Sequence, residues 1–298
     1  MSEAIAYYSF SSAWAILKRT PEKQARKIFS LAADRSWKRN TPGVQQYRKN
    51  LERVLPDGTS KQALEKITRD GVQSYARYWC EMFQMPTWSD ERVLSIVVKD
   101  LDIVTRELQR PPAPVCVGPH SGNYDQAAAY VSLHYGAMCT VVERLKPYKL
   151  YDRFTKEREK YNMEVIPSGA PDALDTLITR AKAGTLVAFT GERDLSKRGI
   201  EVEFFGEKTR IPAGPALIAY EAKSKIIPAS FYYNEDSKAA CDVFDPIDID
   251  FSLDKTAAVQ KATQEWANQI SVGIAENPQD WHMFQPLWLK DLKPRPRR

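Results

Sequence analysis

Residues 120–125, with the sequence HSGNYD, contain a histidine and an aspartate with four residues between them. An imidazole can take a proton from a hydroxyl group through one ring nitrogen while a carboxylate holds the other nitrogen. We expect Asp125 to reach back to His120 from the first turn of a following helix. The alternative is that Asp125 caps this helix and that the backbone satisfies His120.

Glu192 is a second candidate for acid–base chemistry. It follows the apolar run 186–189 and precedes Arg193 and Asp194. Charged groups behind a buried strand cost free energy unless they pair or face a polar cleft. We interpret Glu192 as a second carboxylate of the site, which positions an acceptor hydroxyl or supports His120. Alternatively, Arg193 and Asp194 form a structural pair and Glu192 caps a loop.

Short β-rich runs alternate with helix-length stretches from residue 114 onward, which predicts an α/β fold with a mostly parallel central sheet flanked by helices. Ligands bind at the carboxyl ends of such strands, where His120, Glu192 and the pair Glu143 and Arg144 would lie. A long amphipathic helix is predicted over 255–275. The strands are expected at 115–117, 139–142, 165–166, 186–189, 201–205, 226–233 and 242–244.

Residues 3–110 predict consecutive helices, separated by turns that contain proline or glycine. The sequence shows no internal repeat and no long Gly/Ser linker. We therefore predict a single domain over residues 1–298, with a helical N-terminal region (1–110) and an α/β catalytic core (111–298).

The composition indicates a folded protein, because 43% of the residues are hydrophobic and no apolar run is long enough for a multi-pass membrane protein. The net charge of +5 is spread along the chain, which favours anionic ligands and gives no support to nucleic-acid binding. The four cysteines are far apart, which is typical of a reducing compartment. Neither His134 nor His282 has a partner at metal-ligand spacing, so no metal is expected.

The 120–125 segment resembles the motif of the lipid A late acyltransferases and of their actinobacterial relatives, the phosphatidylinositol mannoside acyltransferases. Both groups are a branch of the glycerolipid acyltransferases, whose shared motif is His-x-x-x-x-Asp. Other segments are similar to the second group: ERLKP at 143–147, GERDLS at 191–196 followed by FFG at 204–206, and DWHMFQP at 280–286.

The resemblance implies an enzyme that moves a fatty acyl chain, palmitoyl by expectation, from acyl-CoA to the mannose 6-hydroxyl of mannosylated phosphatidylinositol. His120 would act as the general base, coenzyme A thiolate would leave, and neither a covalent intermediate nor a cofactor would be needed. Backbone N–H groups at the start of the following helix, including those after Ser121, could stabilise the oxyanion. The alternatives are a lipid A type or lysophospholipid acyltransferase, and a lipid-binding protein without turnover.

Several side chains are candidates for substrate binding. Glu143 and Arg144 lie in a matching segment and would contact substrate, or else form a solvated ion pair on a loop. Arg158 is similar in position to a phosphate-contacting arginine of these relatives, or else is a surface charge. Arg198 and Arg210 flank the FFG segment, before a Pro/Gly helix start at 212–215 that suits a phosphate or a thioester carbonyl, or simply packs on the sheet.

Acylated substrates require access to a membrane. The first helix is rich in aromatic residues and too short to span a bilayer, so it either docks at an anionic membrane surface or packs on the core. Basic residues between 290 and 298 would favour anionic lipid. Glu3 before the apolar run, with Lys18 and Arg19 after it, reverses the charge order of a signal peptide. We expect a peripheral protein on the cytoplasmic face of the cell membrane.

Overall fold

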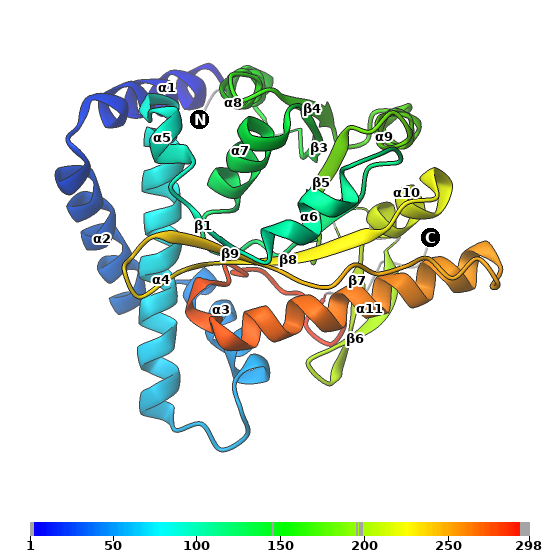
Figure 1. Cartoon of the computed structure of the whole chain (residues 1–298). Helices are drawn as coiled ribbons and strands as arrows, with labels where there is room; N and C mark the ends of the chain where they lie inside the picture. The colour runs from blue at the N-terminus through cyan, green and yellow to red at the C-terminus, as the bar shows by residue number, and fades with distance from the viewer. Residues whose placement is uncertain (1–2, 145, 195, 197–198, 293–298) are drawn as a thin grey trace.

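The computed structural model describes residues 3–144, 146–194, 196 and 199–292. Helices form most of the N-terminal region, as predicted: α1 (Glu3–Arg19), α2 (Glu22–Lys38), α3 (Pro42–Val54) and α4 (Lys61–Gln84). Ser60 caps α4, because its hydroxyl accepts the backbone N–H of Ala63. The long helix α4 stands beside the sheet and packs against α1, α2 and α3 (Figure 1).

The prediction of helices alone up to residue 110 is wrong at one point. After η1 (Met85–Thr87) and α5 (Asp90–Val93), the chain forms the strand β1 (Val97–Lys99), and α6 (Leu101–Glu107) follows. β1 pairs in parallel with β9 (Ala239–Val243) and so becomes an edge of the central sheet. Three residues are too few for the alternation of apolar and polar side chains to indicate a strand.

The central sheet confirms the predicted α/β class. The described residues form seven strands in the order β1-β9-β8-β2-β5-β3-β4. Neighbours are parallel except at β8 and β9, which pair antiparallel. The remaining strands are β2 (Val115–Gly118), β3 (Met138–Val142), β4 (Met163–Pro167), β5 (Leu186–Thr190) and β8 (Ile226–Tyr233).

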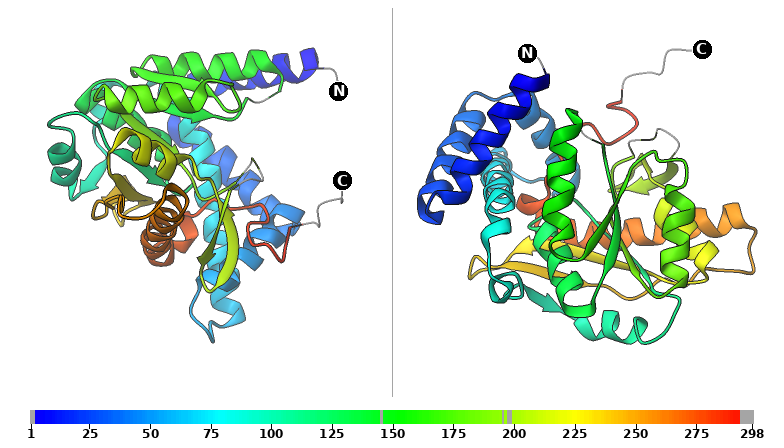
Figure 2. Two further views of the ribbon diagram at one scale, coloured as in Figure 1. Left: turned by 90° about the vertical axis from the view of Figure 1, so that its right-hand side faces the viewer. Right: turned by 90° about the horizontal axis from the view of Figure 1, so that it is seen from above.

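Helices pack on both faces of the sheet (Figures 1 and 2). Val115 and Val117 of β2 point into a core with α9, α10 and α11, whereas Cys116 packs on the opposite side with α6 and α7. This alternation of side chains explains why the central strands are apolar on both faces. The helices are α7 (Tyr124–Tyr135), α8 (Tyr148–Glu159), α9 (Ala173–Lys182), α10 (Gly214–Ala222) and α11 (Lys255–Glu276).

The strand expected at 201–205 exists but lies outside the central sheet. It is β6 (Ile200–Phe204), which forms an antiparallel hairpin with β7 (Glu207–Ile211). The sequence of β7, EKTRI, is mostly polar, and therefore gave no strand signal. Trp288 fastens the hairpin to the body of the protein, because its indole donates to the Phe204 carbonyl at 2.9 Å.

The first helix packs on the body with one face and exposes the other. Trp14 is buried against Phe83 and Phe154, and α1 lies beside α8 (Figure 2). Tyr8 and Ile16 are exposed. In the part of the chain that the structure describes, no helix has the length and apolar character to cross a bilayer. Most of the basic C-terminal tail, residues 293–298, lies outside the described residues.

Candidate active site

His120 and Glu192 meet at the carboxyl edge of the sheet. His120 follows β2 and Glu192 follows β5, and these strands are parallel neighbours. The ring Nδ1 of His120 lies 3.0 Å from Oε2 of Glu192, and the His120 backbone N–H donates to Oε1 at 2.9 Å. The Glu192 side chain is fully buried, whereas 34% of the His120 side chain is exposed. The pair therefore presents the imidazole to solvent and keeps the carboxylate behind it.

The contact with Glu192 determines the tautomer of the His120 imidazole. Burial raises the pKa of Glu192, but the charge and hydrogen bonds of His120 outweigh burial and leave the pKa below its ordinary value. An ionised carboxylate only accepts hydrogen bonds, so Nδ1 carries a proton and Nε2 has a free lone pair. Burial likewise lowers the pKa of His120, yet the charge of Glu192 raises it above its ordinary value overall. Both shifts favour an imidazole that gains a proton readily at Nε2.

Nε2 of His120 faces a hydroxyl group. Thr190, the last residue of β5, places its Oγ1 3.0 Å from Nε2. With Nδ1 protonated, the Thr190 hydroxyl is the donor in this contact. A substrate hydroxyl that replaced this donor would meet the same lone pair, which is the geometry that general-base catalysis requires.

The expected contact between Asp125 and His120 is not found. The Asp125 carboxylate instead accepts hydrogen bonds from the Tyr78 hydroxyl at 2.8 Å and from Arg158 at 2.8 and 3.1 Å. Asp125 does not cap α7 either, because the cap is Asn123, whose Oδ1 accepts the Gln126 N–H. Asp125 lies within the first turn of α7, and its carboxylate joins this turn to Tyr78 of α4 and Arg158 of α8.

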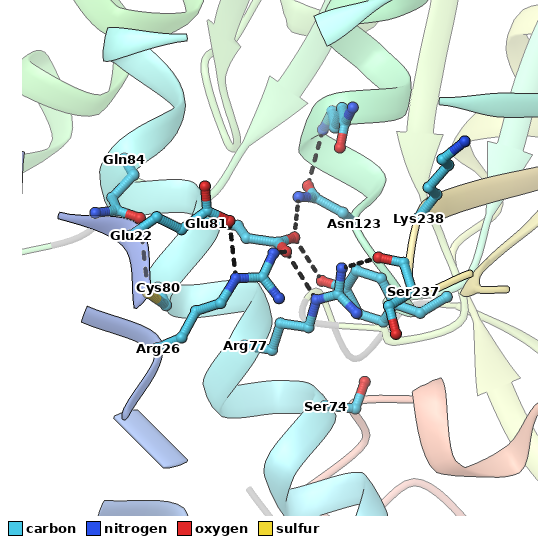
Figure 3. Close-up of polar contacts among 12 residues, drawn as sticks. Glu22, Arg26, Ser74, Arg77, Cys80, Glu81, Gln84, Asn123, Ser237 and Lys238 are labelled. Carbon is cyan, nitrogen blue, oxygen red and sulfur yellow. Dashed lines mark hydrogen bonds and ion pairs between the residues drawn. The ribbon is translucent and has the colours of Figure 1, made fainter. Parts of the chain in front are cut away.

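Glu81 of α4 holds the start of α7 from the N-terminal region (Figure 3). Its Oε2 accepts hydrogen bonds from Asn123 at 2.8 Å and from the Tyr233 hydroxyl at 2.9 Å. Its Oε1 accepts from Arg26 at 2.8 Å and from Arg77 at 2.7 Å. The N-terminal helices thus fix a residue that lies three positions after His120.

Two of the backbone N–H groups near the start of α7 are already bonded, and the N–H groups of Asn123 and Tyr124 stay a prediction for the oxyanion. Ser121 donates to the Pro119 carbonyl, and Gly122 donates to the Asp280 carbonyl, each at 2.9 Å. These donors therefore shape the loop and are not free to stabilise an oxyanion. Gly122 has a φ of +51°, and a Cβ at this position would lie 2.5 Å from the Tyr232 backbone nitrogen. The close approach of the two backbones requires glycine.

The predicted substrate-binding residues are spread over the structure. Glu143 and Arg144 follow β3, beyond β5 on the same edge, and both are exposed. The Arg144 guanidinium lies 4.3 Å from the Tyr148 ring centre. Arg210 lies on β7, 3.8 Å from Glu201 across the hairpin. Arg198 lies outside the described residues. A role for these side chains in substrate binding stays a prediction.

Arg158 is not a free surface charge. Its side chain is mostly buried and forms the ion pair with Asp125. Burial lowers the pKa of Arg158, but the charge of Asp125 outweighs burial and raises it above its ordinary value. The ion pair joins α8 to α7, beside the candidate site. A phosphate contact through the same guanidinium stays a prediction.

Some residues of the site were missed by the sequence analysis. Thr190 sits two positions before Glu192, and its place at a strand end was the one available signal. Trp281, in the matching segment 280–286, is fully buried, and its indole donates to Glu192 at 3.3 Å. The contacts of Tyr78 and Glu81 join segments far apart in sequence, so no local pattern could indicate them.

Comparison with known proteins identifies the family. The family model described as bacterial lipid A biosynthesis acyltransferase matches residues 2–290. The chain is 35% identical over 291 residues to a phosphatidylinositol mannoside acyltransferase of Mycobacterium tuberculosis (strain CDC 1551 / Oshkosh), covering 96% of this chain and 89% of the relative. It is also 35% identical over 286 residues to the protein of that name from Mycolicibacterium smegmatis, covering 95% and 91%. The chain therefore belongs to the bacterial lipid A biosynthesis acyltransferase family.

Proposed function

We propose that this acyltransferase moves a palmitoyl group from its coenzyme A thioester to the mannose 6-hydroxyl of a phosphatidylinositol mannoside, with His120 as the general base. The relatives named as phosphatidylinositol mannoside acyltransferases support the acceptor. The observation that carries the base is the contact of Nδ1 with Glu192, which leaves Nε2 of His120 free to accept a proton.

The reaction needs no covalent enzyme intermediate. Nε2 of His120 takes the proton of the acceptor hydroxyl as its oxygen attacks the thioester carbonyl carbon. The tetrahedral intermediate collapses, the carbon–sulfur bond breaks, and the imidazolium returns the proton to the thiolate of coenzyme A. The buried charge of Glu192 stabilises the imidazolium between these two steps.

Acyl transfer from labelled palmitoyl-CoA to purified mannosylated phosphatidylinositol tests this proposal. We expect His120→Ala to lower kcat by about 10² to 10⁴-fold, the usual contribution of a positioned general base. His134→Ala is the matched control, because His134 is exposed at the far end of α7 and should keep wild-type activity.

The other outcomes are equally informative. If the wild type acylates a lysophospholipid or a lipid A precursor and leaves the mannoside untouched, the proposed acceptor is wrong and the chemistry stands. If no acceptor is acylated while vesicles are still bound, the protein is a lipid-surface binding protein.

We further propose that the protein works as a peripheral protein on the cytoplasmic face of the cell membrane. Exposed apolar side chains on α1 and α2, such as Ile16 and Ile28, support this, and basic Lys27 and Arg35 of α2 are exposed as well. Such a surface suits anionic lipid.

The double variant I16S/I28S should sediment less with vesicles that contain phosphatidylglycerol. Val272→Ser on α11, also exposed, is the control; equal sedimentation of all three proteins would contradict this assignment.

A further inference from the structure

Trp281 connects the C-terminal segment to the acid–base pair. Its indole Nε1–H donates to Oε1 of Glu192 at 3.3 Å, and the side chain is fully buried. The same oxygen accepts the backbone N–H of His120 at 2.9 Å. Since Oε1 has these donors, the other oxygen, Oε2, is left to the ring Nδ1 of His120. The indole thereby restricts rotation of the carboxylate about its last side-chain bond.

The neighbours of Trp281 hold the backbone of the loop that carries His120. The His282 N–H donates to the His120 carbonyl at 2.8 Å, and the Gly122 N–H donates to the Asp280 carbonyl at 2.9 Å. An isolated antiparallel bridge joins Trp281 to Ser121, the loop residue between His120 and Gly122. The backbone that carries the indole is therefore fixed relative to the loop that carries His120.

The segment itself is fixed to the rest of the protein. The buried carboxylate of Asp280 accepts the Tyr233 backbone N–H at 2.9 Å and the Ser74 hydroxyl at 2.5 Å. Tyr233 ends β8, and Ser74 lies in the middle of α4. Because both anchors belong to regular elements, the position of Trp281 is determined by the fold.

We propose that Trp281 is a positioning residue for acyl transfer, which holds Glu192 in the one orientation that lets it pair with both the ring and the backbone of His120. It acts through Glu192 and does not touch the substrate. This inference rests on the proposed function, in which His120 is the base.

The test compares Trp281→Phe with Trp288→Phe. Both indoles are fully buried, they are neighbours in one aromatic cluster, and each donates one hydrogen bond. Trp288 donates to the Phe204 carbonyl and has no role in the pair. We expect Trp281→Phe to lower kcat about tenfold, as for loss of a hydrogen bond to a charged group, with KM unchanged. Trp288→Phe should keep the wild-type kcat per folded molecule.

The pH profile separates positioning from packing. Without the indole, the charge on Glu192 is less stabilised, so the pair binds a proton more tightly and the acid limb of kcat/KM moves to higher pH. Asp125 and Arg193 also act on His120 through space, and both remain in each variant. His282 stays neutral, because burial and His120 lower its pKa to about 3. The acid limb of Trp288→Phe should stay in place.

Equal losses of kcat in the two variants, with the acid limb unmoved, would overturn the inference. If His120→Ala is still inactive, the proposed function survives that result; if His120→Ala is active, the proposed function itself fails.

Should Trp281→Phe not fold, the indole N–H resonances of the ¹⁵N-labelled wild type provide the test. We expect the Trp281 resonance, assigned by elimination with the other Trp→Phe variants, to titrate together with His120. A Trp281 resonance that does not respond to this titration would overturn the inference.

Discussion

Glu192 contacts both the ring and the backbone of His120, although the two residues are 72 positions apart in sequence. One carboxylate thus fixes the side chain of His120, the proposed base, and the loop that carries it. Because β2 and β5 are adjacent and parallel, this contact depends on the order of strands in the sheet.

The first prediction concerns the charge of Glu192. Glu192→Gln keeps the shape of the side chain but removes the charge that raises the pKa of His120, so burial then lowers this pKa. With His120 as the proposed base, activity should require a neutral Nε2 and should be lost in the wild type as pH falls through the raised pKa of His120. The acid limb of kcat/KM should therefore move to lower pH, and the maximal rate should fall by about 10²-fold or more. Glu235→Gln, at an exposed turn, is the control. If the acid limb of kcat/KM does not move in Glu192→Gln, the charge of Glu192 does not set the pKa of the catalytic group, and the prediction is wrong.

The second prediction concerns Asp125, which pairs with Arg158 rather than with His120. Asp125→Asn leaves the guanidinium in a mostly buried place without its counter-charge, which should lower the free energy of unfolding by about 3–5 kcal/mol. Chemical denaturation measures this loss. The acid limb of kcat/KM should move far less than in Glu192→Gln.

A double variant provides the control for Asp125. Arg158→Met combined with Asp125→Asn removes the unpaired charge, so it should be more stable than Asp125→Asn alone. If Asp125→Asn instead leaves stability unchanged and displaces the acid limb, Asp125 acts on His120 directly.

The third prediction concerns Gly122 in the His120 loop. In Gly122→Ala, the new methyl group would meet the backbone nitrogen of Tyr232, which cannot rotate away, so the loop must shift. Gly58→Ala, in the turn after α3, also has a positive φ but meets nothing within 4 Å, and should cost only about 1–2 kcal/mol. We expect Gly122→Ala to have a lower Tm than Gly58→Ala and to lose most activity. Equal Tm values with full activity in both would show that the loop adapts.

The sequence predicted which residues lie at strand ends but not which strands are neighbours. His120 and Glu192 were both placed at the carboxyl edge because each follows an apolar run. Their direct contact requires β5 to lie beside β2, although β3 and β4 come between them in the chain. Asp125 was paired with His120 because it is close in sequence, whereas its partners come from α4 and α8. Contacts between distant segments carry no local sequence signal.

The last prediction concerns the link between the N-terminal helices and the loop. Glu81→Gln replaces one of the two acceptor oxygens by an NH₂ group, which is a donor. At either position, this group faces other donors: Asn123 and Tyr233 on one side, or the two arginines that pair with Glu81 on the other. Asn123 then loses its anchor, and its capping bond to the Gln126 N–H should open more often. Hydrogen exchange at the Gln126 amide should accelerate by about tenfold, the effect of weakening this cap by roughly 1 kcal/mol or slightly more.

Glu22→Gln is the matched control for this link. Glu22 also pairs with Arg26, and with Arg92 at 2.7 Å, but it lies on α2, and the Asn123 side chain donates to Glu81 instead. Exchange at Gln126 should therefore stay at the wild-type rate in Glu22→Gln, and kcat should fall in Glu81→Gln alone. If both variants accelerate exchange equally, the arginine pairs stabilise the helical region as a whole. Glu81 would then have no particular influence on the His120 loop.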